Sequence, residues 1–152
     1  MLRLSLTVSF FLALFVPSTA SALSCVVTLG ERESVRQSFS SATAVFSAYV
    51  EEIYFGHMYG RDNVRMAKLR VLQVWKGDLR PGDVVTSGAD DTTEFMSGGM
   101  APEQRSAVLA YVYSDQPYTL GSCSRSAPLE AGTRDIPLLN KLSKKPEYQL
   151  GG

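Results

Sequence analysis

The pattern that decides the fold lies at residues 64–75, which read Val-Arg-Met-Ala-Lys-Leu-Arg-Val-Leu-Gln-Val-Trp. Two sets of side chains alternate along this stretch, the apolar Ala67, Leu69, Val71 and Trp75 and the cationic Lys68 and Arg70. Successive side chains of a strand point to opposite faces of its sheet, so we expect a strand with one buried and one solvated face.

Further strands are predicted on both sides of this one. Residues 44–54 are rich in β-branched and aromatic side chains and favour a strand, although their paired apolar residues also fit a helix face. Pro81, Gly82 and Asp83 indicate a turn into a short strand at 84–87, which we expect beside 64–75 in one antiparallel sheet.

Two further strands and two loops are also predicted. Residues 107–113 are rich in Val, Leu and Tyr and predict a strand buried on both faces, followed by a returning strand at 118–123. Glycine and asparagine at residues 56–63 predict a turn or exposed loop. Residues 88–105 contain Gly, Ser and acidic residues without a steady period and predict a long surface loop.

Helices are expected near each end of the domain. Val35 and Phe39, four residues apart among charged neighbours, predict a short amphipathic helix over 31–41. Asp135 is the expected N-cap of a C-terminal helix that has Pro137 in its first turn.

These elements predict a mainly β fold with flanking α-helices, of the size of one domain. The element count is that of an OB-fold-like five-stranded Greek-key barrel. A β-sandwich stays open as an alternative because patterning does not fix strand order. We assign this domain to residues 23–142 and expect a flexible tail at 143–152.

The first 22 residues have the features of a secretory signal peptide. Arg3 precedes an uncharged, mostly apolar stretch over residues 4–16, and Ala20 and Ala22 offer the small side chains that signal peptidase requires. We place the cut after Ala22. The alternatives are a membrane anchor, for which the apolar stretch is short against about 20 residues, and lipid attachment at Cys25. We expect a secreted or periplasmic protein without stable membrane insertion.

The charge balance gives no reason to expect a nucleic-acid partner. Residues 1–22 contain only one charged side chain, that of Arg3, so 14 Lys and Arg face 15 Asp and Glu in the remainder. Both cysteines, Cys25 and Cys123, follow the expected cut. An even number of cysteines in an oxidising compartment predicts a Cys25–Cys123 disulfide, the alternative being two reactive thiols.

Several short motifs together resemble the tissue inhibitors of metalloproteases and their netrin-like relatives. They are residues 71–77 (Val-Leu-Gln-Val-Trp-Lys-Gly), residues 110–113 (Ala-Tyr-Val-Tyr) and residues 123–126 (Cys-Ser-Arg-Ser), followed by Leu129, Ala131, Asp135 and Leu138-Leu139. The resemblance implies an OB-type barrel that is non-catalytic and binds a protein, for example a zinc metalloprotease. Relatives usually open with Cys-x-Cys, whereas here Cys25 stands alone.

The resemblance also implies a way in which Cys25 could inhibit a protease. In the animal family the α-amine and carbonyl of an N-terminal cysteine chelate the protease zinc. This mechanism requires a free amine, because an amide nitrogen has no lone pair for zinc. A cut after Ala22 leaves Leu23 and Ser24 ahead of Cys25, so we expect the disulfide rather than the chelate.

For the contact surface we predict a patch of Tyr54, Phe55 and Tyr59, together with the loops at 56–63 and 88–105. No cofactor or resident metal is expected, since His57 is the sole histidine and a stable zinc site takes three or four ligands. A small hydrolase is the least favoured alternative, because no Gly-x-Ser-x-Gly motif is present. Glu51 and Glu52 are adjacent in a predicted strand and should point to opposite faces, which argues against a catalytic carboxylate pair.

Overall fold

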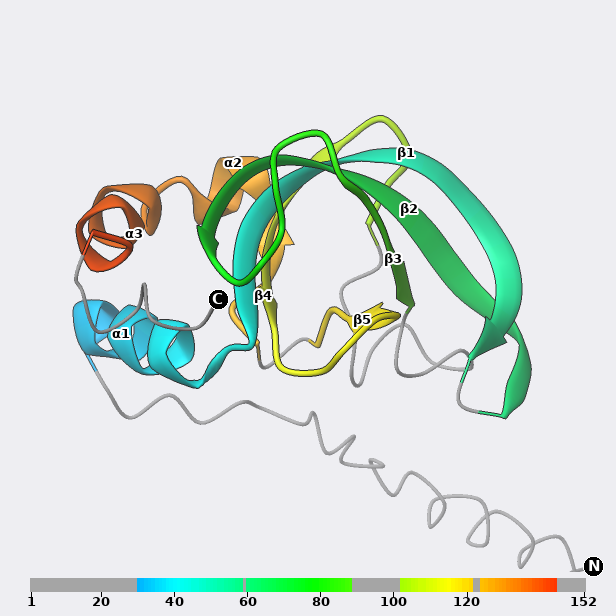
Figure 1. The fold of residues 1–152 in the computed structure, drawn as a ribbon, viewed down its shortest axis with the longest axis horizontal. Helices are drawn as coiled ribbons and strands as arrows, with labels where there is room; N and C mark the ends of the chain where they lie inside the picture. Colours follow the sequence, from blue (N-terminus) through cyan, green and yellow to red (C-terminus); the bar gives the residue numbers. More distant parts are fainter. Residues whose placement is uncertain (1–29, 59, 89–101, 122–123, 145–152) are drawn as a thin grey trace, which may run out of the picture.

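The computed structural model describes residues 30–58, 60–88, 102–121 and 124–144, and within them the protein is mainly β (Figure 1). The elements in chain order are α1 (Glu31–Ser41), β1 (Ala44–Met58), β2 (Arg61–Lys76), β3 (Val84–Gly88), β4 (Ala107–Val112), β5 (Tyr118–Thr119), β6 (Ala127–Pro128), α2 (Leu129–Gly132) and α3 (Ile136–Leu142). The predicted signal peptide, both cysteines, Tyr59 and residues 145–152 lie outside the described residues.

All described strands belong to one sheet in the order β5-β3-β2-β1-β4-β6. The sheet therefore contains six strands rather than the five expected. Neighbouring strands are antiparallel except β3 and β5, which run parallel, with Ser87 opposite Tyr118. The sheet is strongly curved, and α1 and α3 lie together beside one end of it (Figure 1).

Helix α1 has the predicted bounds, and its buried apolar side chains are Val35 and Phe39. No basic residue lies in its last turn. Instead, the ammonium group of Lys76 at the end of β2 donates to the carbonyls of Phe39 and Ser40 at 3.0 and 2.8 Å. A cation at a helix C-terminus satisfies carbonyls that have no partner within the helix, so β2 fixes where α1 ends.

Strands β1 and β2 form a long hairpin that extends away from the helices (Figure 1). The predicted turn or loop at 56–63 is wrong in extent, because Gly56 pairs with Val64 and Met58 with Arg61. Ladder hydrogen bonds continue through residues whose composition suggested a loop. Gly60 and Asn63 take positive φ values of 74° and 60°, which these two residue types tolerate best.

A β-bulge in β2 changes which face its side chains occupy. Ser47 lies opposite Gln73 and Ala48 opposite Val71, so Leu72 is an extra residue. Before the bulge, Ala67, Leu69 and Val71 share one face as predicted. After it, Val74 packs on the inner face and Trp75 on the opposite one. A second register shift at Trp75, between the pairs Phe46–Val74 and Val45–Lys76, leaves Lys76 on the side of α1 as well. The prediction that Trp75 shares a face with Ala67 is therefore wrong.

The two faces of the sheet bury separate cores. The inner core, on one face, consists of Ala44, Phe46, Ala48, Val50, Ala67, Leu69, Val71, Val85, Val108, Ala110, Val112, Tyr118 and Leu120. The helix-side core, on the other, consists of Val35, Phe39, Ala42, Val45, Trp75, Leu109, Tyr111, Leu139 and Leu142. Strand β4 contributes to both cores, which confirms the prediction that it is buried on both faces.

The C-terminal region departs most from the predictions. Of the strand expected at 118–123, the described residues form β5 over Tyr118–Thr119, which pairs with β3. Strand β6 and helix α2 were not predicted. Helix α3 begins after Asp135 with Pro137 in its first turn, as expected. The side chain of Asp135, however, makes no capping hydrogen bond. Asp135 therefore occupies the predicted N-cap position, but its side chain bonds Tyr111 and Arg125 instead of the helix backbone.

The helix α3 is joined to the sheet through Trp75. The indole N–H of Trp75 donates to the Asn140 side-chain oxygen at 2.7 Å, which gives this buried ring the polar partner that it needs. None of the helices in the described part of the chain has the length and apolar character to cross a membrane.

Candidate functional site

The predicted aromatic patch lies near the end of the β1–β2 hairpin, and its members do not share a surface. Tyr54 and Phe55 are consecutive residues of β1, so their side chains point to opposite faces. Tyr59 lies outside the described residues. Of the two described members, Phe55 is 70% exposed and Tyr54 is partly buried.

Tyr54 has a structural role on its face of the hairpin. It packs on a small apolar cluster of Met58, Val64 and Met66, all of which are buried. The Lys68 ammonium lies 5.6 Å from the centre of the Tyr54 ring, within the range of a cation–π contact. Tyr54 therefore stiffens the hairpin and is poorly placed to contact a partner through its ring.

Phe55 lies on the other face among polar side chains. Arg65 is its cross-strand neighbour, and His57 follows it by two residues on the same face. His57 Nδ1 is 2.8 Å from a carboxylate oxygen of Asp62, and both of these side chains are more than half exposed. An exposed aromatic ring with a polar rim is the composition of a protein-binding hot spot.

The carboxylates of Glu51 and Glu52 both pair with cations of β2. The register shifts between Val50 and Glu52, and Glu51 reaches Arg70 while Glu52 reaches Lys68. Lys68 and Arg70 are two residues apart on one face of β2, so the expectation that the two glutamates point to opposite faces is wrong. Hydrogen bonding and charge from Glu52 raise the pKa of Lys68.

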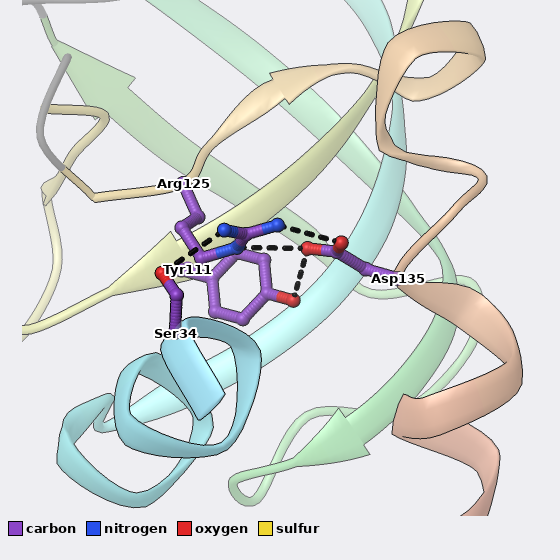
Figure 2. Close-up of polar contacts among 4 residues, drawn as sticks. All are labelled: Ser34, Tyr111, Arg125 and Asp135. Atoms are coloured by element: carbon purple, nitrogen blue, oxygen red, sulfur yellow. Dashed lines mark hydrogen bonds and ion pairs between the residues drawn. The ribbon is translucent and has the colours of Figure 1, made fainter. Parts of the chain in front are cut away.

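A polar network lies at the junction of α1, β4 and the start of α3 (Figure 2). Arg125 donates through Nη2 and Nε to the two carboxylate oxygens of Asp135, at 2.8 and 3.1 Å, and through Nη1 to the Ser34 hydroxyl at 3.0 Å. The Tyr111 hydroxyl donates to the same carboxylate at 2.8 Å. One guanidinium group thus connects elements that are far apart in the sequence.

Burial governs the electrostatics of this network. Desolvation, with the hydrogen bond to the Asp135 carboxylate second, raises the pKa of the Tyr111 hydroxyl far above its usual value. The hydrogen bond to Asp135 raises the pKa of Arg125. Tyr111 is therefore a neutral donor and Arg125 a permanent cation, a combination suited to holding a carboxylate and unsuited to proton transfer near neutral pH.

The segment that carries Arg125 is held against β4 by a serine. The Ser126 hydroxyl accepts from the Tyr111 backbone N–H at 2.9 Å and donates to the Tyr111 carbonyl at 3.2 Å. At that point of β4, the Ser126 side chain makes the hydrogen bonds to the backbone that a neighbouring strand would otherwise make. The sequence offered one signal for the network, since a tyrosine within an apolar strand needs a polar partner for its hydroxyl.

The residues predicted to form a disulfide or to chelate a protease zinc, Cys25 and Cys123, both lie outside the described residues. So does most of the predicted contact loop at 88–105. Among the residues that the structure does describe, no group of three or more His, Cys, Asp and Glu side chains is arranged to hold a metal ion.

No protein-family model matches this chain, and no curated protein sequence matches it.

Proposed function

We propose that this protein is a secreted or periplasmic, non-catalytic protein-binding domain with an OB-type barrel of the netrin-like kind. The observation that carries the proposal is the exposure of Phe55, at 70%, on a hairpin that projects from the sheet. Burying a phenylalanine side chain stabilises a contact by about 1.5–3 kcal/mol, so this ring can anchor a partner.

The strand arrangement supports the barrel. The part of the sheet ordered β3-β2-β1-β4 is a three-strand meander whose fourth strand returns beside the first, the spatial order of a Greek key. The β3–β5 pairing brings the fifth strand to the far side of the meander, and the inner core includes side chains from all five of these strands. The resemblance of residues 71–77, 110–113 and 123–126 to netrin-like domains agrees with this interpretation.

The polar rim supports contact with a protein surface. Arg65 lies opposite Phe55, and the His57–Asp62 pair follows along the hairpin. These polar groups can fix the orientation of a partner after the ring is buried. The rim contains opposite charges side by side and therefore favours no strongly charged polymer.

A photo-crosslinking amino acid in place of Phe55 tests the proposal in the native extracellular or envelope fraction. We expect one reproducible protein adduct, which unlabelled protein displaces and the Phe55→Ser variant does not. The matched control carries the crosslinker in place of Val84, which is 48% exposed on β3. Adducts that are the same at both positions, or that Phe55→Ser displaces as well as the wild type, would contradict the proposal.

A further inference from the structure

A cleft of about 410 Å³ lies between α1 and α3. These two helices lie at the end of the molecule opposite the hairpin (Figure 1). Its apolar lining includes Val35 and Leu138. Its cationic lining is Arg32 and Arg36 from α1, and Arg134 and Lys141 from the α3 region. The volume lies within the range of about 300–1,000 Å³ that is usual for ligand pockets.

The cleft has an excess of positive charge, although the whole chain is neutral. Among the described residues, two carboxylates line it, Glu31 and Asp135, and Asp135 is already bound by Arg125. Within the described residues Arg32, Arg134 and Lys141 form no ion pair. Arg36 contacts Glu33 at 3.3 Å, but both side chains are more than half exposed, so this pair is weak and exchangeable.

The network of Figure 2 fixes both walls of the cleft. Arg125 holds Ser34 on α1 and Asp135 at the start of α3 with the same guanidinium group. Leu139 and Val35 pack in the helix-side core behind the two walls. A site held in this way does not have to be ordered when a ligand binds, which lowers the entropic cost of binding.

We propose that this cleft binds an acidic segment of a partner protein, with carboxylates held by Arg32 and Arg134 and an apolar side chain lying on Pro137 and Leu138. The apolar lining favours a peptide over a small inorganic anion, which has no group to place there. The site is separate from the Phe55 surface, so either one can be correct without the other.

Two short peptides with blocked ends test the proposal by titration into isotopically labelled protein. The probe is Glu-Glu-Leu-Glu-Glu and its uncharged control is Gln-Gln-Leu-Gln-Gln. We expect the acidic peptide to shift the backbone amide signals of Val35 and Leu138, and the uncharged one to leave them unchanged. Because exposed charges are screened by salt, the affinity should fall as ionic strength rises.

Charge-reversal variants locate the binding. Arg32→Glu and Arg134→Glu, both of exposed residues, should each weaken binding about tenfold, whereas Arg80→Glu, outside the cleft, should change it less than twofold. Unchanged thermal unfolding confirms that each variant folds. Equal binding of the two peptides, or an equal effect of Arg80→Glu, would overturn the proposal. So would a sulfated oligosaccharide that shifts the same signals at far lower concentration than the peptide.

Discussion

At the scale of single residues, Arg125 joins parts of the chain that are far apart in sequence, since its partner Ser34 lies 91 positions earlier. Its backbone lies in the left-handed region, with φ at 57°, which costs an L-residue about 1–2 kcal/mol. Its bonds to Ser34 and Asp135 hold it there. The side chain of Asp135 is only 6% exposed, so the carboxylate depends on Arg125 and Tyr111 for its stabilisation.

We predict that Arg125→Gln lowers the free energy of unfolding by about 3 kcal/mol or more, because it leaves the Asp135 carboxylate buried without a counter-charge. Urea unfolding measures the change. Arg36→Gln breaks an exposed ion pair and should change stability by less than about 0.5 kcal/mol. Adding Asp135→Asn to Arg125→Gln should recover part of the loss, and a double variant as unstable as the single one would contradict the role of charge.

Because the pKa of the buried Tyr111 hydroxyl is raised, we predict that the free energy of unfolding falls as the pH rises in the alkaline range. Its pKa in the folded protein is raised above the ordinary value of 10.0, so its contribution is full below about pH 10. Above that pH the unfolded chain loses the tyrosine proton while the folded chain keeps it, and stability falls by up to about 1.4 kcal/mol per pH unit. In Tyr111→Phe this component is absent. Unfolding measured between about pH 9 and 11.5 should therefore give a shallower decline for the variant, and parallel curves would refute the assignment.

At the scale of elements, the bulge at Leu72 lets one strand serve two cores. Without it, strict alternation would place Trp75 on the inner face with Val71 and remove its bond to Asn140. The bulge thus allows β2 to line the inner core over its middle and to support α1 and α3 at its end.

Deleting Leu72 should lower the free energy of unfolding by more than about 3 kcal/mol, since Trp75 and Lys76 would both move to the wrong face. Leu72→Thr keeps the bulge and changes a side chain that is 47% exposed, so it should be close to neutral. Chemical denaturation with tryptophan fluorescence follows both variants. Similar effects of deletion and substitution would show that the bulge is dispensable.

The predictions from sequence succeeded where local pattern determines structure. Residues 31–41 gave a helix with the observed bounds, and the strands at 84–87 and 107–113 were misplaced by one residue at most. They failed where tertiary contacts decide. The composition of 56–63 suggested a loop, but cross-strand pairing extends the hairpin through it. Asp135 is at the predicted N-cap position, but its side chain binds Arg125, ten residues earlier, and makes no capping bond to the helix.

The candidate sites were predicted less well than the fold. Phe55 was identified from its aromatic character, but alternation along β1 separates it from Tyr54. The cleft between α1 and α3 could not be predicted, because its cationic residues come from segments about 100 positions apart that only the folded chain brings together.

At the scale of the whole molecule, the β1–β2 hairpin, which carries Phe55, and the helices α1 and α3, which line the cleft, lie at opposite ends of the curved sheet (Figure 1). A partner that contacts both must span the molecule, and two partners could bind at once. The salt dependence of affinity distinguishes binding at the two surfaces. Burial of Phe55 is largely insensitive to ionic strength, whereas the attraction of charges to the cleft is screened.

A further prediction concerns the position of the mature N-terminus and the state of the two cysteines. Sequencing of the exported chain should give Leu23 as its first residue, and alkylation without reductant should find no free thiol at Cys25 or Cys123. Reduction should then lower the free energy of unfolding by about 2–4 kcal/mol. A mature chain that begins at Cys25 would instead restore the free amine that zinc chelation requires.

Strand β4 lies between the inner core and the helix-side core, and five of its six residues are buried. Consecutive positions therefore meet different packing requirements, Val108 and Ala110 on one side, Leu109 and Tyr111 on the other. In a saturation mutagenesis screen this short segment should tolerate the fewest replacements, polar ones least of all. Divergent homologues should preserve side-chain volume there long after the rest of their sequences have drifted apart.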